Sequence, residues 1–129
     1  MPVASKLDVL IVDDQRAMRA LVLVSLQDMG VVTIREAGDG QEALRELRAR
    51  SAHLVISDMN MPLMDGLELL KAVRADPRIR KTAFILLTSR GEMELVKQAI
   101  ALGVNNYVRK PFTMGDLKKK VEAVLGPLT

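Results

Sequence analysis

Acidic, hydroxyl and basic residues follow four strand-length stretches of this 129-residue chain. Asp13 and Asp14 come directly after one apolar run, and Asp58 comes directly after another. Two further stretches are followed by a hydroxyl and by a cation, Thr88 and Lys110. Any one of these residues has an ordinary explanation as a helix cap, a turn residue or a solvated charge. Their recurrence after successive stretches predicts a shared site.

Three carboxylates in one place repel one another, and this repulsion points to a cation. Like charges about 4 Å apart repel by roughly 4 kcal/mol at an effective dielectric constant of about 20. Mg²⁺ takes oxygen ligands and is commonly held by carboxylates together with phosphate oxygens. We therefore expect Asp13, Asp14 and Asp58 to hold a hard divalent cation, with Lys110 as a second positive group.

The elements that position these residues are strands alternating with helices, which is typical of a parallel sheet built from βα units. Runs 9–12, 54–57 and 84–87 are almost continuously apolar, as in central strands covered on both faces. Runs 31–35 and 106–109 are more mixed, which places them nearer the edges. Helices then lie on both faces, and ligands bind beyond the carboxyl ends of the strands.

Five helices are predicted from apolar residues at helical spacing. The first spans about 15–29 and stops at Gly30, a residue that readily adopts a left-handed conformation. Asp39 can cap the second helix, with Glu42 completing a pattern like a capping box. The third should end near Asp76-Pro77, because proline cannot continue the hydrogen-bond ladder.

Composition excludes several kinds of site. The absence of cysteine and the presence of one histidine exclude disulfides, thiolate catalysis and multi-histidine metal sites. One tyrosine and two phenylalanines offer few stacking platforms, so the net charge of +3 does not indicate nucleic-acid binding. We expect no export signal, no membrane span and a cytoplasmic location. The histidine, His53, precedes the third strand at the end opposite Asp58 and is expected to be structural.

Five short motifs together resemble the receiver domains of two-component response regulators, the CheY-like family, over essentially the whole chain. The resemblance implies an α/β, doubly wound (βα)5 flavodoxin-like fold with a parallel five-stranded sheet of order 2-1-3-4-5. It also implies that residues 1–129 form a single receiver domain with no separate output domain. The motifs are Val12-Asp13-Asp14, Ser57-Asp58-Met59-Asn60-Met61-Pro62, Met64-Asp65-Gly66, Leu87-Thr88-Ser89 and Lys110-Pro111-Phe112.

The same resemblance implies that Asp58 is the phosphoacceptor, which attacks the phosphohistidine of a sensor histidine kinase or a small phosphodonor. A carboxylate can act as such a nucleophile, and phosphoryl transfer mainly needs positioning and charge neutralisation. Lys110 and Thr88 would contact the phosphoryl oxygens. The domain would be no enzyme, because it assists only its own phosphorylation and dephosphorylation. The implied ligands of Mg²⁺ or Mn²⁺ are Asp13, largely through water, Asp14, Asp58 and the main-chain carbonyl of Asn60.

Phosphorylation also implies a partner surface. A phosphoryl group adds roughly −1.5 to −2 charge and can draw Thr88 inward. In the family this motion is coupled to an aromatic residue on the fifth strand, here Tyr107. Arg90 departs from the acidic or amide residues frequent at its position in the chemotaxis subclass. The surface is basic and suits an acidic or amphipathic partner; its residues are Tyr107, Arg90, Lys97, Arg109, Lys118 and Lys119.

Two functions follow from the resemblance. Asn60, Tyr107 and the basic last helix favour a monomeric chemotaxis regulator whose phosphorylated form binds the flagellar motor switch. The alternative is a phosphorelay or stress-signalling receiver that exchanges phosphate with a histidine phosphotransfer protein. A Mg²⁺-dependent phosphatase fits less well, because it usually has a second carboxylate where Asn60 lies. A flavin carrier fits less well, because it usually has a glycine- and hydroxyl-rich loop where Asp14-Gln15-Arg16 lies.

Overall fold

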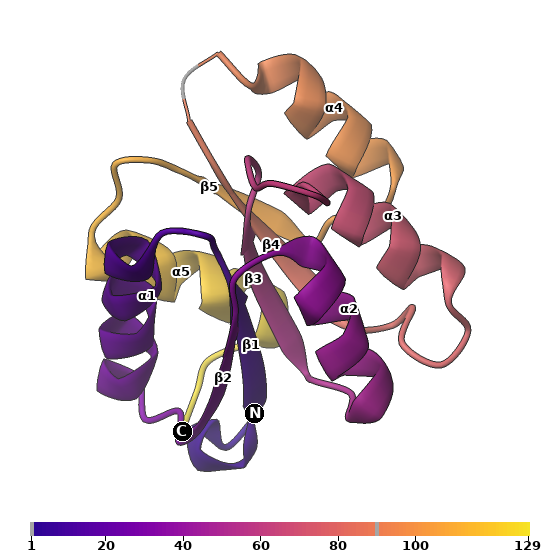
Figure 1. The fold of residues 1–129 in the computed structure, drawn as a ribbon. Helices are drawn as coiled ribbons and strands as arrows, with labels where there is room; N and C mark the ends of the chain where they lie inside the picture. Colours follow the sequence, from indigo (N-terminus) through magenta and orange to yellow (C-terminus); the bar gives the residue numbers. More distant parts are fainter. Residues whose placement is uncertain (1, 90) are drawn as a thin grey trace.

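A computed structural model describes residues 2–89 and 91–129, which form a five-stranded parallel sheet with helices on both faces (Figure 1). The strand order is β2-β1-β3-β4-β5, which confirms the predicted fold. All neighbouring strands are parallel, so their carboxyl ends meet at one edge. After a short 3-10 helix (Ala4–Lys6), the strands span Asp8–Val12 (β1), Thr33–Ala37 (β2), Leu54–Asp58 (β3), Ala83–Thr88 (β4) and Asn106–Arg109 (β5).

The helices form two layers. Helices α1 and α5 lie together on one face of the sheet, whereas α2, α3 and α4 cover the other (Figure 1). Within the described residues, no helix is long and apolar enough to cross a membrane. The helices span Arg16–Asp28 (α1), Gly40–Ala49 (α2), Gly66–Ala75 (α3), Met93–Ala101 (α4) and Met114–Leu125 (α5).

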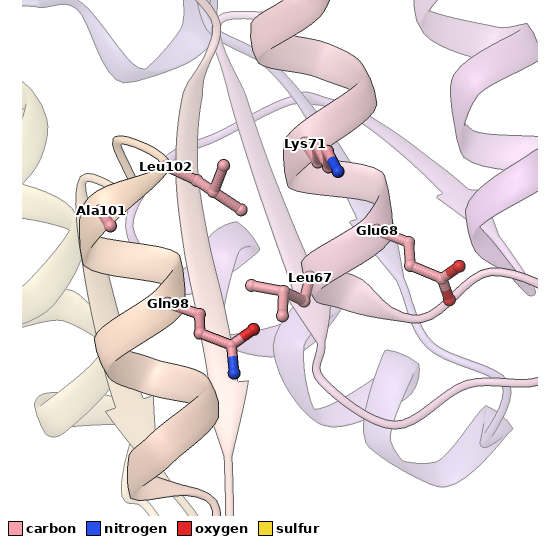
Figure 2. Close-up of a pocket in the computed structure, with 6 residues that line it drawn as sticks. All are labelled: Leu67, Glu68, Lys71, Gln98, Ala101 and Leu102. Atoms are coloured by element: carbon pink, nitrogen blue, oxygen red, sulfur yellow. The ribbon is translucent and has the colours of Figure 1, made fainter.

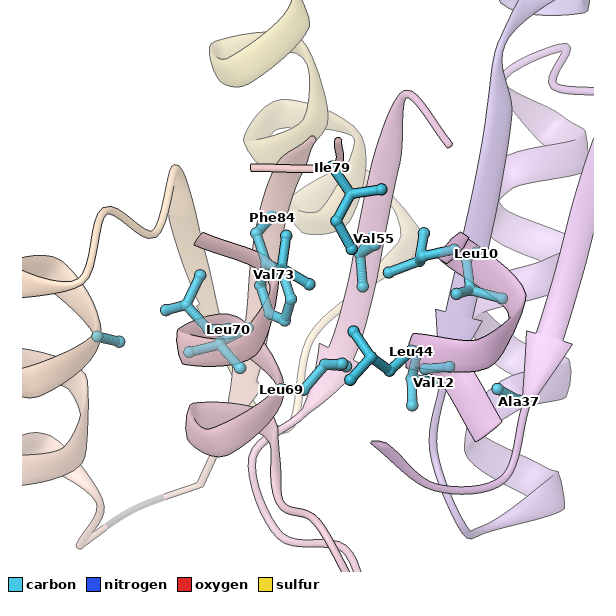
Figure 3. Packing of buried hydrophobic residues seen from close by; sticks show 14 of the residues in the cluster. Leu10, Val12, Ala37, Leu44, Val55, Leu69, Leu70, Val73, Ile79 and Phe84 are labelled. Atoms are coloured by element: carbon cyan, nitrogen blue, oxygen red, sulfur yellow. The ribbon is translucent and has the colours of Figure 1, made fainter. Parts of the chain in front are cut away.

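The central strands are apolar throughout because alternate side chains enter different core layers. In β1, Leu10 and Val12 belong to the layer beneath α2 and α3, whereas Val9 and Ile11 belong to the layer beneath α1 and α5. Figure 3 shows Leu10 and Val12 near Leu44 of α2. Full burial of such a side chain stabilises the fold by about 1.5–3 kcal/mol. The two layers hold the strand ends in fixed positions.

Side-chain caps determine where several helices begin. Asp65 and Glu68 form a reciprocal capping box at α3, where each side chain accepts the other's backbone N–H. At α2, Asp39 accepts the N–H of Glu42 as predicted. The Glu42 carboxylate, however, accepts the N–H of Gly38 and not that of Asp39. The second helix therefore has only half of the predicted capping box.

The second strand begins later than the sequence predicts. The expected strand was 31–35, but β2 spans Thr33–Ala37 and pairs with β1 from Thr33 onward. Val31 is buried, and its N–H donates to the carbonyl of Leu26 in the last turn of α1. Apolar periodicity does not distinguish a buried residue of a helix-to-strand connection from the first residue of a strand.

Candidate functional site

Three carboxylates meet at the carboxyl edge of the sheet. Asp13 and Asp14 follow β1, and Asp58 is the last residue of β3, the strand that pairs with β1. One oxygen from each of these residues lies within 4.8 Å of the others. Asp13 and Asp58 are buried, whereas Asp14 is exposed. The cluster is therefore a buried pair of acids with one side open to solvent.

Asp58 is held by the neighbouring strand and by a lysine. It pairs with Leu87 of β4, and its Oδ1 accepts the backbone N–H of Met59 at 3.0 Å. The Nζ of Lys110 donates to the same Oδ1 at 2.7 Å. Lys110 follows β5, and its backbone N–H donates to the carbonyl of Thr88. The lysine thus reaches Asp58 from a strand that is two positions away in the sheet.

Close packing beneath Asp58 requires a glycine at the start of α3. The N–H of Gly66 donates to the carbonyl of Met59 at 2.9 Å. A Cβ at Gly66 would lie 2.3 Å from the carbonyl oxygen of Asp58 and 2.8 Å from Leu86. Carbon atoms do not approach an oxygen this closely without displacing the backbone. Gly66 therefore determines how near α3 comes to the acidic cluster.

The surroundings of Asp13 disfavour its charged form. Its pKa is raised from 3.8 to about 6, mainly by burial and also by the nearby charges of Asp58 and Asp14. The N–H of Gln15, which donates to Asp13 Oδ1 at 2.9 Å, and the charge of Lys110 act in the opposite direction. Asp13 Oδ2 is buried and has no hydrogen-bond partner among the described residues.

This arrangement fits a hard cation. Among the described residues, the three clustered carboxylates have one salt bridge, from Lys110 to Asp58, and one Asp13 oxygen is buried without a hydrogen-bond partner. Buried carboxylate oxygens are normally hydrogen-bonded or bound to a metal. An oxygen-only donor set of this kind suits Mg²⁺ or Mn²⁺ more than a soft metal.

Two other predicted site residues lie at the end of β4 and in the loop after β3. Thr88 is the last residue of β4 and is buried. It directly follows Leu87, the residue of β4 that pairs with Asp58. Asn60 is exposed, two residues after Asp58, and its side-chain amide donates to Glu92. The structure thus brings Thr88, Asn60 and the acidic cluster to one edge, while their chemical roles stay predictions.

The predicted partner surface is formed by α4, β5 and α5. Tyr107 is half-buried in β5, and the Nζ of Lys120 lies 5.4 Å from the centre of its ring. Lys97 of α4 is exposed and pairs with Glu94 at 3.3 Å. Arg90 lies outside the described residues. The other predicted members are exposed, on β5 or α5: Arg109, Lys118 and Lys119.

Sequence reasoning missed Glu92, the residue that precedes α4. Its carboxylate accepts hydrogen bonds from Ser89 and from Asn60. The spacing Ser89-x-x-Glu92 before an apolar run is a capping-box pattern that could have drawn attention to it. The contact with Asn60 has no local sequence signal, because it depends on how two loops meet.

A hollow of about 440 Å³ lies apart from the acidic cluster, between α3 and α4 (Figure 2). Figure 2 shows Leu67 and Leu102 pointing into the space between the two helices. The hollow contains none of the residues predicted to form the site. Its lining residues are Leu67, Glu68, Lys71, Gln98, Ala101 and Leu102.

Comparison with known proteins identifies the family. The family model described as "Response regulator receiver domain" matches residues 9–122. The chain is 47% identical to the "Probable chemotaxis protein CheY" of Rhizobium etli, with 99% of each chain covered. It is 43% identical to chemotaxis protein CheY1 of Helicobacter pylori, covering 91% of this chain and 95% of that protein.

Solved structures agree. The chemotaxis response regulator CheY4 of Vibrio cholerae superposes with a TM-score of 0.84 at 36% identity, over 92% of this chain and 98% of that one. The bacteriophytochrome response regulator RtBRR superposes with a TM-score of 0.81 at 29% identity, over 92% and 77%. With the acidic cluster and the strand order, these matches establish that the chain belongs to the response regulator receiver domain family.

Proposed function

We propose that Asp58 accepts a phosphoryl group from the phosphohistidine of a sensor kinase or from a small phosphodonor, with Mg²⁺ or Mn²⁺ bound at the acidic cluster. The observation that carries this proposal is the acidic cluster, in which Asp58 pairs with Lys110 and one oxygen of Asp13 is buried with no partner among the described residues. A carboxylate of this kind can act as a nucleophile toward phosphorus. In the transfer, an Asp58 oxygen bonds to phosphorus as the donor's bond to phosphorus breaks: nitrogen–phosphorus in phosphohistidine, which leaves histidine, or oxygen–phosphorus in acetyl phosphate, which leaves acetate.

The protein's own residues would supply orientation and charge neutralisation. Asp13, Asp14, Asp58 and the Asn60 carbonyl would hold the cation, which neutralises phosphoryl charge when bound. Lys110 already contacts the attacking carboxylate, so a small movement of its side chain would bring it to a phosphoryl oxygen. Thr88 would donate its hydroxyl from the end of β4.

We propose that the output is phosphorylation-dependent protein binding in chemotaxis, in the cytoplasm, with the flagellar motor switch as partner. Two of the relatives carry chemotaxis names at 47% and 43% identity. The exposed basic residues of α4, β5 and α5 would attract an acidic or amphipathic segment and mainly speed its association. Tyr107, half-buried on β5, would move together with Thr88 on phosphorylation and so alter this surface.

The second candidate is a phosphorelay receiver that exchanges phosphate with a histidine phosphotransfer protein. The similarity to a bacteriophytochrome response regulator supports this second candidate, because it shows that the same fold serves a pathway other than chemotaxis. The two candidates share the chemistry at Asp58 and differ only in the partner. A mixing experiment with each purified partner separates them.

The test of the chemistry is labelling with radioactive acetyl phosphate and Mg²⁺. The natural protein should acquire an acid-stable, base-labile label, and Asp58→Asn should lose all of it while keeping its circular dichroism spectrum. Asp28→Asn, an exposed carboxylate at the end of α1, is the matched control and should label normally. Labelling of Asp58→Asn would point to another acceptor.

The partner is tested with beryllofluoride, which mimics the acyl phosphate. The beryllofluoride form should bind a flagellar motor switch protein more tightly than the free form, and Lys119→Glu should weaken that binding. Rapid transfer of label to a histidine phosphotransfer protein, without binding to the motor switch protein, would support the phosphorelay instead.

A further inference from the structure

Glu92 joins two loops at the edge of the acidic cluster. Its Oε1 accepts the backbone N–H of Ser89 at 2.5 Å and the hydroxyl of Ser89 at 2.9 Å. Its Oε2 accepts the side-chain amide of Asn60 at 2.5 Å. We call these three groups the rim donors. One carboxylate thus engages three donors from the β3–α3 and β4–α4 loops.

The rim donors lie beside the proposed site of phosphoryl transfer. Asn60 comes two residues after Asp58, the last residue of β3. Ser89 comes directly after Thr88, the last residue of β4, and β3 and β4 are paired in register. The rim donors therefore extend from the same strand ends that carry the phosphoacceptor and the proposed hydroxyl donor.

A local turn does not explain the whole arrangement. Contacts between Ser89 and Glu92 could form half of a capping box. Helix α4 begins only at Met93, however, and the side chain of its N-cap residue, Glu92, makes no capping hydrogen bond. The Asn60 amide is 32 residues away in the sequence and belongs to another loop. Its contact indicates that the carboxylate links the loops.

A carboxylate and a phosphoryl group have similar requirements. Both carry negative charge on oxygen, and both bind most strongly to N–H and O–H donors. A phosphoryl group arriving at Asp58 would find nearby donors already occupied and would also be repelled by the charge of Glu92. Both effects oppose phosphorylation.

We propose that Glu92 is an intramolecular competitor of the phosphoryl group: its carboxylate occupies the rim donors in the free protein and releases them when Asp58 is phosphorylated. This inference rests on the proposed function and adds a residue that controls it. Glu92 acts through the rim donors and is a positioning residue. Its release would also detach the start of α4 from the β3–α3 loop and so reach the predicted partner surface.

The experiment compares Glu92→Gln with Glu94→Gln. Glu94 lies two residues later, is exposed and contacts Lys97, so its variant removes the same charge without touching the rim donors. Glu92→Gln should raise the initial rate of labelling by acetyl phosphate by about tenfold, equivalent to about 1.4 kcal/mol, close to the contribution of one hydrogen bond to a charged group. Glu94→Gln should label at the natural rate.

A second measurement does not depend on labelling. In ¹H–¹⁵N spectra, the Ser89 amide of the natural protein should shift on addition of Mg²⁺ and beryllofluoride, because it exchanges one acceptor for another. Glu92→Ala removes the acceptor beforehand, so its free form should already differ from the natural protein at Ser89. It should also reach half-saturation at a lower beryllofluoride concentration.

The outcomes distinguish failure of the proposed phosphorylation of Asp58 from failure of the proposed competitor role of Glu92. If the natural protein takes no label, the proposed function fails. If it takes label on Asp58 but Glu92→Gln labels no faster than Glu94→Gln, or more slowly, the competitor role is wrong and the function stands. An unchanged Ser89 amide in Glu92→Ala would also overturn the competitor role.

Discussion

At the amino end of the sheet, Asp8 lies between two arginines, with Arg35 at 3.0 Å and Arg50 at 3.1 Å. At the carboxyl end, Asp13, Asp14 and Asp58 crowd together and share one lysine. The same strands connect both ends, because β1 begins with Asp8 and ends just before Asp13. Within residues 2–89 and 91–129, Asp8 is paired with two arginines, whereas the three carboxylates at the other end have one salt bridge, from Lys110 to Asp58.

Arg74 shows how complete the compensation is away from the site. Its guanidinium donates to the carbonyls of Arg80, Thr82 and Gly103 and to the side chain of Asn105. These bonds join α3 to the loops before β4 and β5. Burial lowers the pKa of Arg74, and the five hydrogen bonds offset the cost of that burial.

The difference between the ends separates stability from function. Away from the site, Asp8 and Arg74 are each matched by donors or acceptors of the chain. Where a carboxylate oxygen stays buried and unpartnered, the chain carries an energetic cost that a bound cation would remove. The predictions below test this contrast by removing groups from each end.

The largest effect is expected at Arg74. Arg74→Ala should lower the free energy of unfolding by about 3 kcal/mol, because it removes the five hydrogen bonds that join α3 to the loops before β4 and β5. Urea denaturation of the variant measures the change. Lys71→Ala, one turn earlier and exposed, should change stability by less than about 0.5 kcal/mol. Equal effects of the two variants would contradict the proposed role of the Arg74 network.

Substitution of Asp13 is expected to raise the stability of the metal-free protein, whereas substitution of Arg74 lowers stability. With a folded-state pKa of about 6 and an ordinary value of 3.8, the folded, metal-free protein binds more protons than the unfolded chain between these values. Its stability should therefore fall as the pH rises from about 4 to about 6. Asp13→Asn should remove this dependence and stabilise the metal-free protein at pH 7 by at most about 3 kcal/mol.

Thermal unfolding in a chelator between pH 4 and pH 8 measures that change. Asp14→Asn is the matched control, because Asp14 is exposed and should affect stability less. Adding Mg²⁺ should stabilise the natural protein and reduce the advantage of Asp13→Asn. The energetic cost assigned to the buried Asp13 carboxylate would be contradicted by two results together. The natural protein in chelator would be more stable at pH 7 than at pH 5, and Asp13→Asn would have the same stability as the natural protein.

The smallest effect is expected at His53. Its Nδ1 accepts the backbone N–H of Asp8 at 2.9 Å at the amino end, in agreement with a structural role. His53→Ala should cost about 1 kcal/mol of stability or less, the contribution of one neutral hydrogen bond. Labelling of Asp58 by acetyl phosphate should be unchanged. Loss of labelling in this variant would show that the two ends are not separate in function.

Much of the fold could be predicted because its signals are local. Continuous apolar runs indicated β1, β3 and β4 as central strands, and the mixed run at 106–109 coincides with β5. Asp76-Pro77 ended α3 as predicted. The predicted start of β2 at residue 31 is wrong, because Val31 is buried by packing against the core and not by strand pairing.

The candidate site could be predicted only as a set of residues. Parallel strands bring their carboxyl ends together, so Asp13, Asp14 and Asp58 were expected to lie at one edge. The sequence did not predict that Gly66 packs against the Asp58 carbonyl or that Glu92 contacts Asn60. Both contacts join residues of different loops, whose relative positions depend on how the helices pack.

The sequence by itself determined how strands and helices alternate along the chain and which chemical groups follow each strand. Only the tertiary structure decided which carboxylate is buried, which oxygen lacks a partner and which acceptor holds each donor. The reason is that burial and hydrogen bonding are properties of neighbours in space. Asp13 and Asp14 are adjacent in the chain, yet one is buried and the other faces solvent.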